Sequence, residues 1–274
     1  MIPADGMPGP RPGERDDVMT ELAFHEAEVA DRCGEASCLA DPCRHGESAG
    51  RCAGCGVRAV SICSALEGDE LEQLEALGTT ARFAEKETMF LQDDAADWVY
   101  NLLSGMVRLY RLLPDGRRQI FGFLLPGDFM GLALSERYAF SADAVEPVSA
   151  CRFARGAFSG LVDAKPHLLR RLHGAATHEL TLAQDHMVLL GRRRAEERVA
   201  AFLIGMRQRM VLLGRSAVTL PLPMSRQDIA DYLGLTIETV SRTFTRLARE
   251  KAIVIVPDGV RLLDAPRLEA MAAA

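Results

Sequence analysis

Long apolar segments are missing from this chain of 274 residues. No run of about 18 apolar residues occurs, so the sequence predicts no membrane-spanning helix. The first residues also lack the apolar stretch of a secretory signal. We therefore expect a cytoplasmic protein without a membrane partner. In a reducing compartment, its seven cysteines favour metal binding or redox sensing over structural disulfides.

Two motifs that are common in enzymes are absent as well. The chain has neither a Walker-type glycine loop nor a His-Glu-x-x-His helix, and we expect no enzyme activity. The net charge of -6 does not favour nucleic acid either, because overall acidity repels phosphate. However, the basic residues gather late, between Arg192 and Lys251, whereas acidic residues crowd the first hundred positions. Only the C-terminal third is therefore expected to face phosphate.

A helix-turn-helix pattern lies in this basic third. Ser225, followed by Asp228, is typical of a capping box and starts a first short helix, which Gly234 interrupts. Thr236 can cap a second helix. Val240, Phe244 and Leu247 share one face of that helix, and the opposite face carries Glu238, Ser241, Arg242, Thr245 and Arg249. One face can pack while the other is free to read DNA.

The free face of the second helix has side chains suited to base edges. Arg242 can donate paired hydrogen bonds to guanine, Glu238 can accept one from a cytosine amino group, and the Ser241 hydroxyl is adaptable. Glu238 and Arg242, four residues apart, could equally form an exposed ion pair. A hairpin follows, with strands at 253–256 and 260–263 around a turn at 257–259. The order of these elements predicts a winged helix-turn-helix.

The cysteines are concentrated near the start, and six of the seven lie between positions 33 and 63. Cys52 and Cys55 are separated by two residues, so both thiolates can reach one metal centre. Such a pair needs further ligands. A zinc site could draw them from Cys33, Cys38, Cys43, His45 or Cys63, and an iron-sulfur cluster would equally need four thiolates. The residues themselves leave both kinds of site open.

Short strands dominate the region after Leu66. A helix is predicted at 69–77. Strand candidates are Phe83, 88–91, 99–103, 106–113 and 119–124, with turns at 104–105, 114–116 and 126–128. Repeated short strands joined by hairpin turns predict a small double-sheet jelly roll. Residues 1–50 begin rich in proline and glycine and then turn acidic, which predicts a disordered arm that contains the extra cysteines.

A long helix is predicted from Pro166 to about Gly191. One set of its residues recurs at alternating spacings of four and three, as in the seam of a two-stranded coiled coil. These residues are Leu169, His173, Ala176, Leu180, Ala183, Met187 and Leu190. An ordinary amphipathic helix packed on its own domain would show the same pattern over three heptads. We predict that the seam is the interface of a homodimer.

The helix-turn-helix resembles that of the FNR branch of the cyclic-AMP receptor protein superfamily of bacterial regulators. The segment from Leu235 to Arg242 is similar to the recognition helix of that branch. The resemblance implies that Glu238, Ser241 and Arg242 read a TTGAT half-site in a palindromic operator on double-stranded DNA. It also implies an activator with RNA polymerase as a partner.

The cysteine spacing carries a second part of the resemblance. Cys52, Cys55 and Cys63 are spaced as in alphaproteobacterial members of the branch, and Cys151 occupies the place expected for a fourth ligand. The resemblance implies an oxygen-labile 4Fe-4S cluster on these four residues that favours the dimer. Cys33, Cys38 and Cys43 have no counterpart in the family pattern.

The resemblance also implies an α+β fold in three parts. These parts are a cluster-binding segment with a cyclic-nucleotide-binding-like β-roll sensor domain over 51–165, a dimerisation helix over 166–191, and a winged helix-turn-helix DNA-binding domain over 192–274. Cyclic-nucleotide binders of the superfamily hold the phosphate with an Arg-Ser or Arg-Thr pair, which 127–132 and 138–144 lack. We therefore predict no cyclic nucleotide ligand. The alternatives are a regulator with a structural zinc site and a haem-based nitric-oxide or redox sensor using His173, His178 or His186.

Overall fold

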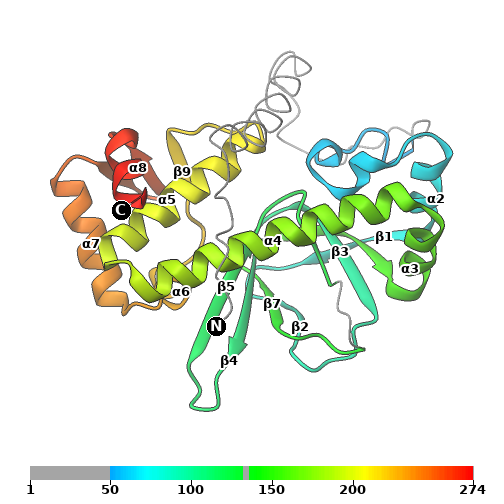
Figure 1. Cartoon of the computed structure of the whole chain (residues 1–274), viewed down its shortest axis with the longest axis horizontal. Coiled ribbons are helices and arrows are strands. Elements are labelled where there is room, and N and C mark those ends of the chain that lie inside the picture. Colours follow the sequence, from blue (N-terminus) through cyan, green and yellow to red (C-terminus); the bar gives the residue numbers. More distant parts are fainter. Residues whose placement is uncertain (1–49, 132–135, 274) are drawn as a thin grey trace, which may run out of the picture. The chain divides into compact units, whose positions relative to one another are not determined.

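The computed structural model describes residues 50–131 and 136–273 (Figure 1). The predicted arm, with Cys33, Cys38 and Cys43, lies outside the described residues except for its last position. Within the described ranges, no helix is both long and apolar enough to cross a bilayer.

The described chain begins with the cysteine segment. Two short 3-10 helices, η1 (Arg58–Val60) and η2 (Ile62–Ala65), lead into helix α2 (Asp69–Leu77), which has the predicted bounds. Three acidic residues in the first turn of α2 lie at the positive end of its helix dipole. Leu71 and Leu74 of α2 are buried in one cluster with apolar side chains of strands that follow in the chain, among them Val99 and Phe153. This packing fixes the cysteine segment against the first sheet.

Two four-stranded antiparallel sheets follow, and they confirm the predicted β-roll. One sheet has the order β1-β8-β3-β6 and the other the order β2-β7-β4-β5. Their strands are β1 (Gly78–Phe83), β2 (Thr88–Phe90), β3 (Trp98–Ser104), β4 (Val107–Leu112), β5 (Arg118–Leu124), β6 (Phe129–Met130), β7 (Ser141–Ala144) and β8 (Val148–Ala154). Buried side chains from both sheets, including Leu102 and Leu109, form the core. Strands β6, β7 and β8 were not predicted.

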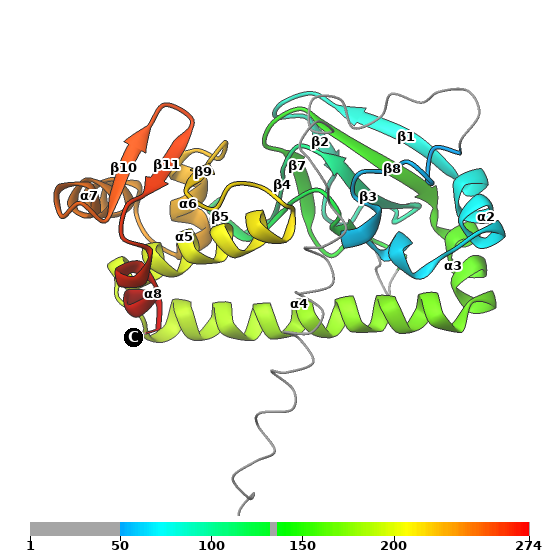
Figure 2. The same cartoon turned by 90° about the horizontal axis from the view of Figure 1, so that it is seen from above.

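Helix α3 (Arg155–Ala164) joins the roll to helix α4 (Pro166–Arg192), which Figure 2 shows as one uninterrupted rod. One side of α4 is buried through Leu172 and Leu189. The predicted seam lies on the other side, where Leu180 and Met187 are 58% and 63% exposed. Leu190 is the exception, because it is half-buried and packs on the C-terminal domain of its own chain. The rest of the seam is available to a second chain.

The C-terminal domain has the predicted winged helix-turn-helix order. Its elements are α5 (Ala195–Leu212), β9 (Thr219–Pro221), α6 (Arg226–Leu233), α7 (Ile237–Arg249), β10 (Ile253–Val256), β11 (Gly259–Leu262) and α8 (Ala265–Ala273). The sequence did not predict β9, which pairs with β11. A Cβ atom at Gly259 would lie 2.0 Å from the Leu220 carbonyl oxygen, so this pairing requires glycine.

Candidate DNA-reading helix and cysteine pocket

The turn between α6 and α7 follows from its capping residues. Ser225 and Asp228 form the predicted capping box, in which each side chain accepts from the other's backbone N–H. Gly234 ends α6 in the left-handed conformation at φ 60°, which glycine adopts without strain. The Thr236 hydroxyl then accepts from the Thr239 amide at 3.2 Å and starts α7. These local signals set the angle between the two helices.

Helix α7 has the two faces that its sequence predicts. Val240, Phe244 and Leu247 are buried, whereas Glu238, Ser241 and Arg242 are exposed. The backbone N–H of Glu238 and the Thr236 hydroxyl lower the pKa of Glu238, and Arg242 makes a smaller contribution. Ion pairing with Arg242 is thus a minor part of the Glu238 environment. The three predicted reading residues point away from the core together.

Several arginines in the basic third also make contacts within the chain. Arg207 and Arg246 pair with Glu269 and Glu196 respectively. The Arg226 guanidinium lies 3.4 Å from the centroid of the Phe244 ring, an arrangement that cation–π attraction stabilises. A count of basic residues therefore overstates the charge that is available to DNA.

Arg198 connects the ends of two helices and the link after the first of them. Its guanidinium donates to the Leu190 carbonyl at 2.8 Å, to the Arg193 carbonyl at 2.9 Å and to the Leu233 carbonyl at 2.9 Å. Carbonyls at helix C-termini lack partners within their own helix. One side chain thus satisfies acceptors at the end of α4, in the α4–α5 link and at the end of α6.

A surface pocket brings together cysteines that are distant in sequence. Cys52 and Cys55 from the loop before η1 and Cys151 from β8 line it. Cys151 pairs with Thr80 of β1 and Asn101 of β3, so strands flank it on both sides. Cys63 is buried beside this pocket, in the same apolar cluster that Cys52 and Cys151 contact. The four predicted ligands thus occupy one region.

The buried thiols of this region are protonated at neutral pH. Burial, and after it the charge of Glu75, raises the pKa of Cys52 to about 12. Burial also raises the pKa of Cys63. Within the described residues, no three His, Cys, Asp or Glu side chains form a group that could hold a metal ion. Metal binding here would displace protons from the thiols and would draw the ligands into a closer arrangement.

Glu75 holds the cysteine loop, and sequence reasoning missed it. Its carboxylate accepts from the Arg51 amide at 2.7 Å and from the Cys52 amide at 3.1 Å. These bonds, the one from Cys52 most strongly, lower the pKa of Glu75. A Cβ atom at Gly50 would lie 2.7 Å from the same carboxylate, so glycine gives it room. A lone glutamate on a short helix carries no sequence signal for this role.

Comparison with known proteins gives the family. Residues 80–165 match the family model for the cyclic nucleotide-binding domain, and residues 197–271 match that for the Crp-like helix-turn-helix domain. The chain is 55% identical over 223 residues to the nitrogen fixation regulation protein FixK of Bradyrhizobium diazoefficiens, a match that covers 81% of this chain and 94% of that protein. It is 57% identical over 220 residues to the transcriptional activatory protein AadR of Rhodopseudomonas palustris. This match covers 80% of this chain and 92% of AadR.

A solved structure agrees with these matches. The structure of FixK2 from Bradyrhizobium japonicum is similar with a TM-score of 0.68 and 38% identity, covering 72% of this chain and 98% of that one. The similarity thus extends over both domains and the long helix between them. The chain belongs to the Crp/FNR family and is a DNA-binding transcription regulator.

Proposed function

We propose that this regulator is an activator, responds to oxygen through a 4Fe-4S cluster on Cys52, Cys55, Cys63 and Cys151, and binds a palindromic TTGAT-type operator as a homodimer. The observation that carries the proposal is the position of the thiols. Cys151 lies 96 positions after Cys55, yet both line one pocket with Cys52. Contact with RNA polymerase at the promoter is part of the same proposal.

Four thiols are the donor set by which proteins hold a 4Fe-4S cluster. A structural zinc site also takes four thiolates, at about 2.3 Å from the ion, so the metal analysis described below has to separate the two. When bound, the cluster would supply an oxygen-labile link between the cysteine loop and β8.

The residues of the chain would couple that link to the dimer. Glu75 holds the Cys52 loop against α2, and η2 with Cys63 packs in one cluster with Leu168 and Leu172 of the dimerisation helix α4. A change in the cysteine segment therefore reaches α4 through direct packing. Pairing of two α4 helices then decides whether the protein binds both half-sites of the operator. In a dimer, the second recognition helix binds its half-site at a high effective concentration.

Oxygen-free purification with iron, acid-labile sulfide and zinc analysis tests the cluster. We expect about four irons and four sulfides per chain, a broad visible absorption that air bleaches, and loss of the dimer on bleaching. Zinc without sulfide would replace the proposal with a structural zinc site. A Soret band that survives replacement of Cys52 would indicate a haem sensor.

Arg242→Ala is expected to remove discrimination at the guanine of the TTGAT half-site. A bidentate arginine contact is worth about 1–3 kcal/mol against the wrong base, so the variant should bind matched and guanine-substituted duplexes almost equally. Arg249→Ala is the matched control, because Arg249 is exposed on the same helix and should weaken both duplexes alike if it contacts phosphate. Fluorescence anisotropy with the duplexes measures both. Full discrimination by Arg242→Ala would contradict the reading role.

We infer further that the β-roll takes no cyclic nucleotide. Part of its core is aromatic, with the rings of Phe90 and Tyr138 stacked at 3.8 Å between centroids and Phe90 also stacked on Tyr100. The Tyr138 hydroxyl donates to the Trp98 carbonyl at 2.7 Å, which fixes the ring in place. The inference rests on the segments 127–132 and 138–144, which lack the Arg-Ser or Arg-Thr pair that would hold the cyclic phosphate.

A further inference from the structure

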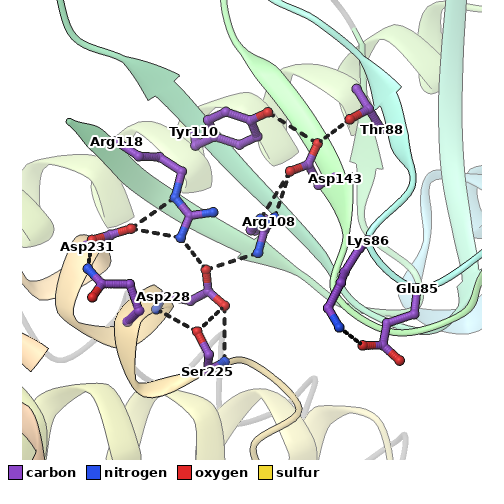
Figure 3. Close-up of polar contacts among 11 residues, drawn as sticks. Glu85, Lys86, Thr88, Arg108, Tyr110, Arg118, Asp143, Ser225, Asp228 and Asp231 are labelled. Atoms are coloured by element: carbon purple, nitrogen blue, oxygen red, sulfur yellow. Dashed lines mark hydrogen bonds and ion pairs between the residues drawn. The ribbon is translucent and has the colours of Figure 1, made fainter. Parts of the chain in front are cut away.

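Two arginines of the sensor domain contact the first helix of the helix-turn-helix (Figure 3). Arg108 of β4 donates to the Asp228 carboxylate at 3.0 Å. Arg118 of β5 donates to Asp228 at 2.5 Å and to Asp231 at 2.8 Å and 2.9 Å. Gln119 adds a hydrogen bond to the Asp231 carbonyl at 2.7 Å. Five residues from two domains thus meet in one polar network, which we call the α6 anchor: Arg108, Arg118, Gln119, Asp228 and Asp231.

The α6 anchor is largely shielded from solvent and its charges are paired. The side chains of Arg108, Arg118 and Asp228 are 16%, 22% and 5% exposed. Arg108 also forms an ion pair with Asp143 at 2.8 Å. The Asp143 carboxylate in turn accepts a hydrogen bond from the Tyr110 hydroxyl at 3.2 Å. Removing one partner of a buried ion pair leaves an uncompensated charge. The arrangement therefore has a strong preference for one geometry.

The same aspartate also defines the start of α6. Asp228 accepts from the Ser225 amide at 3.0 Å and from the Ser225 hydroxyl at 2.7 Å. Burial alone would raise the pKa of Asp228, but these bonds and the charges of Arg108 and Arg118 outweigh it and lower the pKa. One carboxylate thus caps α6 and binds the sensor domain. Since α6 and α7 share one core, the orientation of α6 is also that of the recognition helix.

A dimer on a palindrome needs this orientation. The two recognition helices must enter the major groove about 10 base pairs apart, and a DNA-binding domain that swivels on its sensor domain would reach several spacings. We propose that Arg108 and Arg118 are positioning residues for DNA binding, which hold α6 so that α7 is presented at one fixed half-site spacing. This inference rests on the proposed palindromic operator.

Operator duplexes of different spacing test the α6 anchor in the full chain. The probes are two inverted TTGAT half-sites about 10 base pairs apart, the same sites with one base pair inserted between them, and one isolated half-site. The variants are Arg118→Met, which keeps an apolar stem, and the isosteric Asp231→Asn. Arg117→Met is the matched control, because Arg117 pairs only locally with Asp115 and is 78% exposed.

We expect the wild-type protein and the control to prefer the correct spacing by on the order of tenfold, the effect of one poor base contact. Both anchor variants should bind the correct operator about tenfold more weakly, lose most of the spacing preference, and keep wild-type affinity for the isolated half-site. Should Arg118→Met fail to fold, Asp231→Asn alone decides.

Two results would overturn the inference. Folded anchor variants with wild-type spacing preference would show that the network does not orient α7. An equal loss on the isolated half-site would show that it only supports the fold of α6. A wild-type protein with no spacing preference at all would instead refute the proposed palindromic operator, so the two failures are distinguishable.

Discussion

Replacing Cys151 with serine should abolish iron binding and weaken operator binding under oxygen-free conditions by on the order of 100-fold, because avidity from the second half-site is lost. Cys151 lies in β8 between two hydrogen-bonded neighbours, so serine fits the strand without disturbing it. The fold should survive, and only the ligand set should be incomplete. On one preparation, iron analysis measures the bound metal, size-exclusion chromatography the dimer and fluorescence anisotropy the affinity for the operator.

A cysteine outside the family pattern provides the control for this experiment. Cys38→Ser should keep its iron, its dimer and its operator affinity. If Cys151→Ser retained four irons and bound as tightly as wild type, the fourth ligand would be elsewhere. If both variants lost iron, the extra cysteines would belong to the site.

Phe244→Ala is expected to destabilise the DNA-binding domain by about 3–5 kcal/mol, the usual cost of emptying a large aromatic site in a core. Phe244 is only 1% exposed. Its ring also contacts the Arg226 guanidinium, which lies 3.4 Å from the ring centroid. Helix α7 would lose its central anchor, so operator binding should fall with stability. Urea unfolding followed by circular dichroism measures the change.

The neighbouring position separates packing from helix propensity. Thr245 is exposed on the same turn, and Thr245→Ala should change the free energy of unfolding by no more than about 0.5 kcal/mol. A Phe244→Ala protein as stable as this control would mean that the α7 core can close around the missing ring.

Much of this fold was predictable because its signals are local. Helix α2 has its predicted bounds, and the capping box at Ser225 and the break at Gly234 appear where the sequence places them. Strand β7 was not predictable, since Ser141, Ala142, Asp143 and Ala144 lack the β-branched and aromatic residues typical of strands. All four are buried nevertheless, because distant partners such as Arg108 satisfy the charge of Asp143.

The candidate DNA-reading helix and its contacts likewise divide into features with local sequence signals and features that depend on distant residues. The exposed face of α7 follows from helical periodicity alone, which placed Glu238, Ser241 and Arg242 correctly on one side. The partner of Arg118 lies 110 positions along the chain, and no pattern in either segment indicates that pairing. Contacts that depend on how two domains pack are therefore visible only in the folded chain.

Three backbone carbonyl groups at the junction between α4 and the DNA-binding domain accept hydrogen bonds from Arg198. A planar guanidinium with five donors in a fixed fork can serve three acceptors at once, whereas a lysine ammonium acts as a single compact point charge. Arg198 therefore links the end of α4 to the end of α6 through a single side chain.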